Sequence, residues 1–303
     1  MKIWIPQKYG LSHLDHLIEQ ADIEIADDPA DLPSDPANVD FLVPTFLDQP
    51  SMRPLLPSMT GLKVLQLPSS GSDGWAEVTR PEATIAHARG VHDSSTAEWV
   101  LTAILASLRE LPALHDAQRD ARWQPRRGRD LLGKRILLIG AGSIGSAVAR
   151  RLKPFGVRLT KVARTARPDE DIHPITELPA LLPNAEVVIL LVPLTAETRG
   201  LVDREFLAAL PDGALLVNAA RGPVVDTEAL LAELGTGRLA AALDVTDPEP
   251  LPAGHPLWRE PHTLITPHIA AQTNGMLPRV YDLVARQLER FLAGEPLLNQ
   301  VVR

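Results

Sequence analysis

Runs of apolar residues recur along the chain, separated by polar, turn-forming or helix-like stretches. Beyond residue 134 these runs span residues 135–139, 157–163, 185–192, 214–218, 239–244 and 263–266. Runs with so little polar alternation are typical of strands that are buried on both faces, as in a parallel sheet. Because helix-like or loop segments separate them, the pattern predicts a doubly wound, parallel α/β sheet of the dinucleotide-binding type.

The first hundred residues have a different character. They are rich in Pro, Asp and Ser, and their apolar runs are short, at residues 3–5, 40–43 and 62–67. Short runs between turn-forming clusters predict a small α/β unit with short strands.

Two longer helices frame the predicted dinucleotide-binding sheet. One is predicted over residues 96–111, after the capping residues Ser94 and Ser95 and ended by Pro112. An amphipathic helix is predicted over residues 276–293, and we expect it to complete the N-terminal unit. The predicted domains are a discontinuous substrate domain, residues 1–94 completed by 273–303, and a dinucleotide-binding domain, residues 95–272.

Composition and charge narrow the classes of function. The 303 residues are 45% hydrophobic and 22% charged, which is an ordinary globular composition for a chain of two domains. A net charge of −8 and a pI near 5.6 repel nucleic acid and anionic lipid, so an anionic substrate needs local basic groups. No stretch approaches the roughly 20 apolar residues that cross a bilayer, and the N-terminus has no secretory pattern, so we expect a cytoplasmic protein that binds neither nucleic acid nor membrane.

The chain contains no cysteine, which excludes disulfides, thiolate catalysis and any Cys-ligated metal site. Its nine histidines occur in neither an HExxH nor an HxH pattern. We therefore expect no metal centre.

A glycine-rich motif follows the apolar run 135–139. The glycines are Gly140, Gly142 and Gly145, with Ser143 and Ile144 between them, and the helix-like stretch SAVARRL comes next. In a strand–loop–helix setting, such glycines allow a tight turn, let the backbone approach a pyrophosphate and let the helix pack on the strand. The sequence therefore predicts dinucleotide binding at this loop.

An acidic residue that usually ends the second strand and binds the ribose 2′-hydroxyl is absent. The strand is expected to end at Ala163, and Arg164, Thr165 and Arg167 follow. Guanidinium groups bind phosphate oxygens through charge-assisted bonds, so this composition favours NADP over NAD. The alternative is that both arginines are solvated and that NAD binds without the acidic contact.

Three segments after the later strands carry groups suited to reducing a 2-keto acid. They are Arg221 in NAARGPVVD, Glu249 in ALDVTDPEPLP, and His268 in TPHIA. An imidazolium can protonate the alkoxide that forms when hydride reaches a keto carbon, and a guanidinium can stabilise its charge. A carboxylate on the other imidazole nitrogen fixes the tautomer, a role for which Glu249 is the candidate and Asp247 the rival.

These motifs, together with LLGKRILLIGAGSIG, VPLTAETRGLVD and HPLW, resemble the D-isomer-specific 2-hydroxyacid dehydrogenase family over essentially the full length. The resemblance implies two α/β domains: a doubly wound Rossmann-type parallel sheet and a smaller, flavodoxin-like substrate domain. It implies that Arg221, Glu249 and His268 are the catalytic residues, with Arg221 and His268 also contacting substrate.

The resemblance also implies further contacts. Backbone N–H groups of the loop at Ser70, Gly71 and Ser72 are expected to bind the substrate carboxylate, and Asp244 to face the nicotinamide carboxamide. The expected coenzyme-binding residues are Gly140, Gly142, Ser143, Ile144, Gly145, Arg164, Thr165, Arg167, Val192, Pro193, Thr198, Ala219 and Asp244. Residues 44–46 and Trp75 are candidates for sizing the substrate pocket.

The expected function is an NAD(P)-dependent oxidoreductase for small, anionic 2-keto and D-2-hydroxy acids such as glyoxylate or hydroxypyruvate. Formate oxidation is disfavoured, because formate dehydrogenases of similar fold have glutamine at the position of Glu249. Phosphoglycerate or phosphite oxidation and a non-catalytic dinucleotide sensor remain alternatives.

Oligomerisation is expected along the helix 96–111. Its apolar stripe exceeds what a small domain buries on a connecting helix, and the resemblance suggests a two-fold homodimer there. The stripe consists of Trp99, Leu101, Ile104, Leu105 and Leu108. Burial in the core of one chain is the alternative.

Overall fold

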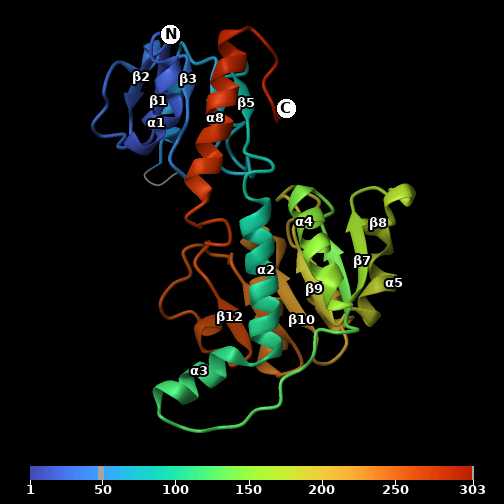
Figure 1. The fold of residues 1–303 in the computed structure, drawn as a ribbon. Coiled ribbons are helices and arrows are strands. Elements are labelled where there is room, and N and C mark those ends of the chain that lie inside the picture. Colours follow the sequence, from blue (N-terminus) through green and yellow to red (C-terminus); the bar gives the residue numbers. More distant parts are fainter. Residues whose placement is uncertain (47–50, 302–303) are drawn as a thin grey trace. The chain divides into compact units, whose positions relative to one another are not determined.

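The computed structural model describes residues 1–46 and 51–301 (Figure 1). The chain forms two compact units. The first consists of Met1–His92 together with Asn274–Arg303, and the second of Asp93–Thr273. The chain thus leaves the first unit, builds the whole of the second and then returns to the first.

The first unit contains a five-stranded parallel sheet in the order β2-β1-β3-β4-β5. This order is that of a flavodoxin-like fold. The strands are β1 (Lys2–Ile5), β2 (Asp22–Ile25), β3 (Phe41–Leu42), β4 (Val64–Gln66) and β5 (Thr84–Ala86). The expected apolar runs form β1, β3 and β4, whereas β2 and β5 were not expected.

Alternate residues of these strands enter two cores on opposite faces of the sheet. Ile3, Ile5 and Phe41 belong to one apolar cluster, and Trp4 and Leu42 to the other. The helices of this unit are α1 (Leu11–Leu14) and α8 (Met276–Leu292), and α8 fills the first cluster. A parallel sheet needs cover on both faces, so the C-terminal helix is an integral part of this unit.

A buried polar contact fixes the C-terminal segment to the first unit. The side-chain amide of Gln287 donates to the side-chain oxygen of Gln66 at 2.7 Å, and its own oxygen accepts the backbone N–H of Leu298 at 2.8 Å. Both glutamine side chains are fully buried. Buried amides that are hydrogen-bonded to each other specify a single register, because any shift would leave polar atoms unsatisfied.

The second unit contains a seven-stranded parallel sheet in the order β12-β11-β10-β9-β6-β7-β8. Strand order reverses between β6 and β9, which is the topological switch point where ligands bind in open α/β sheets. The strands are β6 (Arg135–Ile139), β7 (Arg158–Ala163), β8 (Ile172–Pro174), β9 (Val187–Leu190), β10 (Leu215–Asn218), β11 (Ala240–Leu243) and β12 (Thr263–Ile265). This is the doubly wound, Rossmann-type sheet that the apolar runs predict.

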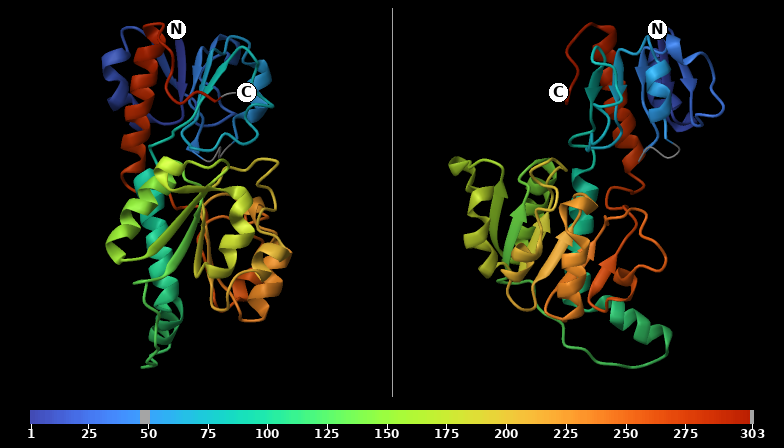
Figure 2. Two further views of the ribbon diagram at one scale, coloured as in Figure 1. Left: turned by 90° about the vertical axis from the view of Figure 1, so that its right-hand side faces the viewer. Right: turned by 180° about the vertical axis from the view of Figure 1, so that it is seen from behind.

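Helices cover both faces of this sheet (Figure 2). Ile136 and Leu138 of β6 face a cluster that includes residues of α2 and α4, whereas Leu137 and Ile139 face a cluster that includes residues of α5, α6 and α7. The helices are α2 (Asp93–Leu108), α3 (Leu111–Arg119), α4 (Ser143–Leu152), α5 (Leu178–Leu181), α6 (Arg204–Ala208) and α7 (Thr227–Gly235).

The helix expected over residues 96–111 differs from the one observed. Helix α2 already includes Ser94 and Ser95, and a second helix, α3, starts just before Pro112. Between them, Glu110 adopts a left-handed backbone with φ of 53°. Proline lacks an N–H that the first helical turn does not need, so Pro112 lies in the opening turn of α3 instead of simply ending α2.

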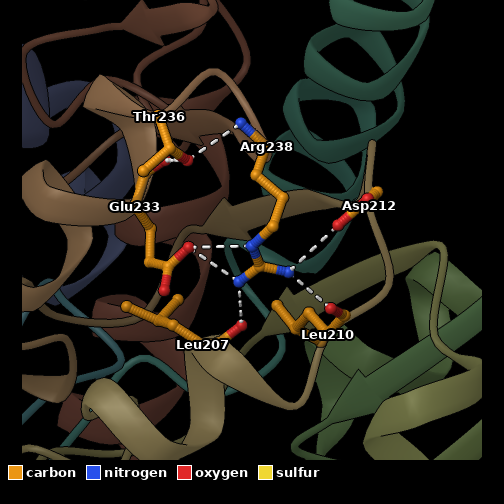
Figure 3. Close-up of polar contacts among 6 residues, drawn as sticks. All are labelled: Leu207, Leu210, Asp212, Glu233, Thr236 and Arg238. Carbon is orange, nitrogen blue, oxygen red and sulfur yellow. Dashed lines mark hydrogen bonds and ion pairs between the residues drawn. The ribbon is translucent and has the colours of Figure 1, made fainter.

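Arg238, just before β11, joins the C-terminal end of α6 to α7 (Figure 3). Its guanidinium donates to the carbonyl oxygens of Leu207 and Leu210 at 2.7 and 2.6 Å. Its Nε and Nη2 both contact one carboxylate oxygen of Glu233, at 2.9 and 2.7 Å. The side chain donates to carbonyl groups at a helix end, and it does so with a charge of favourable sign.

Candidate active site

The glycine-rich loop joins β6 to α4 at the switch point of the larger sheet. Gly140 has φ of 114°, and a Cβ there would lie 2.5 Å from the carbonyl of Leu191. A Cβ on Gly145 would lie 2.1 Å from the carbonyl oxygen of Gly140, whereas a Cβ on Gly142 would meet open space. The loop therefore packs tightly against β9 and its own helix, and leaves room on its outer side.

Helix α4 begins at Ser143, and Ser143, Ile144 and Gly145 form its first turn. The N–H groups of a first turn have no partner within the helix and carry partial positive charge. Together with the open space at Gly142, they form a cradle that fits a pyrophosphate. The residues present thus fit a dinucleotide.

Of the basic residues after β7, Arg167 lies beside this loop. Nη2 of Arg167 donates to the carbonyl oxygen of Ala141 at 2.8 Å, and its Nη1 lies 3.2 Å from Oε1 of Glu170. Arg164 and Thr165 are exposed. A hydrogen bond from Thr195 lowers the pKa of Glu197, and the charge of Arg164 contributes a smaller lowering. Arg167 therefore faces a carboxylate as well as the loop, and the charge of Arg164 acts on the carboxylate of Glu197.

The loop after β9 contains three of the expected coenzyme-binding residues: Val192, Pro193 and Thr198. The hydroxyl of Thr198 donates to the carbonyl oxygen of Pro193 at 2.6 Å and accepts the N–H of Thr195 at 2.8 Å. Thr198 is 8% exposed, and its side chain stabilises this loop through these two hydrogen bonds. Ala219, in the loop after β10, donates its N–H to the carbonyl of Leu190.

Arg221 follows β10 and is held by Asn218, the last residue of that strand. The Asn218 side chain accepts the N–H of Ala220 at 3.0 Å and donates to the carbonyl of Arg221 at 3.1 Å. The next residue is Gly222, where a Cβ would lie 1.9 Å from the carbonyl oxygen of Thr246. Only glycine allows the Arg221 loop to approach the loop after β11 so closely, which is the loop that carries Glu249.

His268 and Glu249 form a close pair. Nδ1 of His268 lies 2.6 Å from Oε1 of Glu249, and the two side chains are 25% and 41% exposed. The glutamate comes from the loop after β11 and the histidine from the segment after β12. Among the described residues Asp247 has no such contact with the histidine, so the carboxylate beside His268 is that of Glu249.

Asp244, at the end of β11, holds the backbone around the histidine. Its carbonyl oxygen accepts the N–H of His268 at 2.7 Å. Its carboxylate accepts three further bonds, from the Thr266 hydroxyl at 2.6 Å and from the N–H groups of Ile269 and Ala270 at 2.9 Å each. His268 itself has a left-handed backbone, with φ of 52°. A strained conformation of this kind persists only where the surroundings enforce it.

This bracing role of Asp244 was not anticipated from the sequence, where the residue was expected to face the nicotinamide. Asp244 is 2% exposed, and both carboxylate oxygens already accept hydrogen bonds from the segment 266–270. The only sequence feature that hints at this role is the position of Asp244 just after an apolar strand.

The loop at residues 69–75 of the first unit is shaped by its own side chains. The Ser69 hydroxyl donates to the carbonyl of Gly71 at 2.8 Å, and the Ser70 hydroxyl to that of Ala88 at 3.2 Å. Within residues 1–46 and 51–301, the backbone N–H groups of Ser70, Gly71 and Ser72 donate no hydrogen bond. Consecutive N–H groups without an internal acceptor are groups that can bind an anion.

Trp75, considered for the substrate pocket, is 5% exposed and packs in the second apolar cluster of its unit. It is a core residue. Phe46 packs on the ring of His92, with 5.5 Å between centroids.

Across the part of the chain that the structure describes, no cluster of three or more His, Asp or Glu side chains is arranged to hold a metal ion. In the same residues no helix is long and apolar enough to span a membrane.

A family model described as the NAD binding domain of D-isomer specific 2-hydroxyacid dehydrogenases matches residues 101–270, which is more than half of the chain. The chain belongs to this family. It is therefore an oxidoreductase, an NAD(P)-dependent 2-hydroxyacid dehydrogenase. The glycine-rich loop, Arg221, Glu249 and His268 all lie within the matched segment.

Relatives of this dehydrogenase cover most or all of its length. A glyoxylate reductase of Thermofilum pendens is 39% identical in an alignment 247 positions long, which covers 76% of this chain and 73% of the relative. The human glyoxylate reductase/hydroxypyruvate reductase is 31% identical in an alignment 320 positions long, gaps included, which covers 99% of this chain and 98% of the relative. A D-isomer specific 2-hydroxyacid dehydrogenase from Xanthobacter autotrophicus Py2, solved with NADPH and MES, is 31% identical, with a TM-score of 0.83 over 99% of this chain and 97% of that chain.

Proposed function

We propose that this dehydrogenase reduces a small 2-keto acid, glyoxylate or hydroxypyruvate, to the corresponding 2-hydroxy acid, with the D-configured alcohol as substrate in reverse. The observation that carries the proposal is the contact of 2.6 Å between His268 and Glu249. The loop that contains Glu249 packs against the loop that contains Arg221. The names of the relatives from Thermofilum pendens and human support this substrate class.

His268 is proposed as the acid and base of the reaction. A bound nicotinamide dinucleotide supplies or accepts the hydride. With Nδ1 engaged by Glu249, Nε2 of His268 is the nitrogen that protonates the developing alkoxide. The carboxylate of Glu249 stabilises the imidazolium before this transfer and fixes the ring orientation after it.

Arg221 is proposed to bind the substrate carboxylate and keto oxygen through its guanidinium, which can donate two parallel hydrogen bonds. As negative charge develops on the keto oxygen, the guanidinium stabilises it electrostatically. The unused N–H groups of Ser70, Gly71 and Ser72 are proposed to bind the substrate carboxylate as well. In this scheme the second unit is the dinucleotide-binding domain and the first is the substrate domain.

For the coenzyme, we propose NADP in preference to NAD. The support is the absence of an acidic side chain at Ala163 and the position of Arg167, which is hydrogen-bonded to Ala141 of the glycine-rich loop. A guanidinium there can bind a 2′-phosphate. The structure of the relative from Xanthobacter autotrophicus contains NADPH, which is consistent with this preference.

The proposed function is tested by initial rates of NADPH and NADH oxidation with glyoxylate, hydroxypyruvate, pyruvate and a bulkier 2-keto acid. We expect turnover with the small acids and a lower KM for NADPH. Faster turnover with NADH would contradict the coenzyme proposal alone. The absence of turnover with every keto acid would contradict the substrate proposal. Assays with phosphite, with phosphoglycerate and of coenzyme binding would then distinguish the two other oxidations from a non-catalytic dinucleotide sensor.

We also propose a homodimer. Ile104 and Leu108 of α2 are buried in the core of the second unit, so part of the expected stripe needs no partner. Large apolar side chains nevertheless remain exposed in the segment that follows α2: Leu111 is 51% exposed, Trp123 98% and Leu132 75%. A contiguous patch of exposed apolar residues marks an interface, and these side chains are proposed to contribute to one in the dimer. Sedimentation at micromolar concentration should give the mass of two chains, and a Trp123→Ser variant should dissociate more readily.

A further inference from the structure

The guanidinium of Arg53 lies over the loop at residues 69–75 of the first unit. Its Cζ is 4.4 Å from the centroid of the Trp75 ring, and its Nη2 donates to the carbonyl oxygen of Asp73 at 3.1 Å. Trp75 is 5% exposed and belongs to the apolar core, so the ring is a fixed platform. A guanidinium stacked on an indole combines a cation–π contact with planar packing.

The turn at residues 72–75 packs closely against the guanidinium of Arg53. Gly74 has φ of 72°, and a Cβ there would lie 2.8 Å from Nη1 of Arg53. The N–H of Trp75 donates to the carbonyl of Ser72 at 3.2 Å. The arginine thus contacts the C-terminal half of the loop.

The N-terminal half of the loop is held separately. The N–H of Ala88 donates to the carbonyl of Ser69 at 2.8 Å, and the hydroxyls of Ser69 and Ser70 donate to backbone carbonyls. Between the two halves lie the N–H groups of Ser70, Gly71 and Ser72, which donate no hydrogen bond within the described residues. The order of this segment depends on both ends of the loop being fixed.

We propose that Arg53 is a positioning residue for this loop: it acts through Trp75 and Asp73 and keeps the three N–H groups ordered for the substrate carboxylate. This inference rests on the proposed function. A loop that is ordered only part of the time binds its ligand more weakly by that fraction. Loss of the clamp should therefore raise the KM for the keto acid and leave the coenzyme KM and kcat unchanged.

A competing explanation is that Arg53 attracts the anionic substrate by its charge alone. The matched control is Arg80→Met, which removes a cation from the same unit at a surface pair with Glu82. Arg53→Lys separates the two explanations further. The lysine ammonium keeps the positive charge, but it lacks the planar guanidinium that stacks on Trp75 and at the same time donates to the carbonyl of Asp73.

The experiment compares the wild type, Arg53→Met, Arg53→Lys and Arg80→Met. For each protein we would measure the KM for keto acid, the KM for coenzyme, kcat, and hydrogen exchange of the amides of residues 70–75. We expect Arg53→Met to raise the keto-acid KM about tenfold and to accelerate exchange of the Trp75 amide, whose N–H donates to the carbonyl of Ser72, with kcat and the coenzyme KM within about twofold. Arg53→Lys should recover only part of both effects, and Arg80→Met should match the wild type.

Unchanged KM and exchange in Arg53→Met would overturn the inference. Full recovery in Arg53→Lys, together with a raised KM in Arg80→Met, would also overturn it in favour of charge alone. If Arg53→Met does not fold, Arg53→Lys carries the test, and wild-type values of both KM and exchange in that variant contradict the clamp. If the wild type is inactive with every keto acid, the proposed function fails, while the exchange rates still report on the clamp.

Discussion

The backbone N–H of His268 donates to the carbonyl oxygen of Asp244 at 2.7 Å, across the gap between the ends of β12 and β11. The same aspartate accepts the N–H groups of Ile269 and Ala270 through its carboxylate. The proposed acid and base of the reaction is thus fixed from its backbone side by Asp244 and from its ring side by Glu249.

Asp244→Asn should therefore lower both stability and turnover. The new amide cannot accept on both sides, so a buried N–H loses its acceptor, and we expect the free energy of unfolding to fall by about 2 kcal/mol. The histidine segment should loosen, which lowers kcat more than it raises the coenzyme KM. Chemical denaturation and steady-state kinetics measure the two effects. Asp203→Asn, at the N-cap of α6, is the control and should preserve kcat.

His268→Ala should remove the proton donor and leave coenzyme binding intact. General acid–base catalysis contributes about 10²- to 10⁴-fold, so kcat should fall within that range. The dissociation constant for coenzyme, measured by fluorescence titration, should stay within about threefold, because the glycine-rich loop lies between β6 and α4 and His268 lies after β12. A kcat near that of the wild type would exclude the proposed role.

Arg167→Gln should discriminate between the coenzymes. Loss of a charge-assisted contact costs about 1.5–3 kcal/mol, so the KM for NADPH should rise about ten- to a hundredfold while that for NADH changes little. The control is Glu170→Gln, which removes the carboxylate beside Arg167 and should not weaken NADPH binding. Equal changes for both coenzymes would mean that Arg167 only shapes the loop.

Arg238→Met should destabilise the second unit without altering its chemistry. The substitution removes the guanidinium donors of the Leu207 and Leu210 carbonyls and leaves the Glu233 carboxylate without its ion-pair partner. We expect a loss of about 2–3 kcal/mol in the free energy of unfolding. Thermal and urea unfolding provide the measurement, and exposed Arg204→Met on α6 should have little effect.

Glu186 should contribute a pH-dependent part of the stability. Its hydrogen bond with Lys134, 2.7 Å long, lowers the pKa of the carboxyl. A lowered pKa in the folded state means that the stabilisation is present above the unfolded pKa and is lost as pH falls through the folded value. The unfolding free energies of the wild type and Glu186→Gln should therefore differ by about 1 kcal/mol above pH about 5 and converge below pH about 4. A constant difference would contradict this.

Strands β6, β9 and β10, which are largely buried, could be predicted from their apolar runs, and so could the edge strand β12. The run 135–139 forms β6, in the middle of the larger sheet. Strands β2, β5 and β8 were missed, and all three lie at sheet edges, where fewer positions need to be apolar. Strand β2 reads DIEI and β8 reads IHP, which are too polar and too short to form an apolar run.

The sequence predicts those site residues whose role follows from their chemical type. It does not predict contacts that form only when distant segments pack together. The sequence motifs indicate Glu249 as the partner of His268, and the two side chains are in contact in the structure. The bracing by Asp244 joins residues more than 20 positions apart, and the position of Arg53 over Trp75 joins residues 22 apart. Such pairings are decided by tertiary packing, which periodicity and motif spacing do not encode.

The discontinuity of the first unit has a consequence for the order of folding during synthesis. Helix α8 supplies Tyr281 and Leu288 to a core that also contains Ile3 and Phe41. While the ribosome is still translating the last thirty residues, β1 and β3 lack this cover, whereas the contiguous second unit can already be complete. The first strand to be synthesised is therefore among the last to be buried, and until then its apolar face is a natural substrate for chaperones.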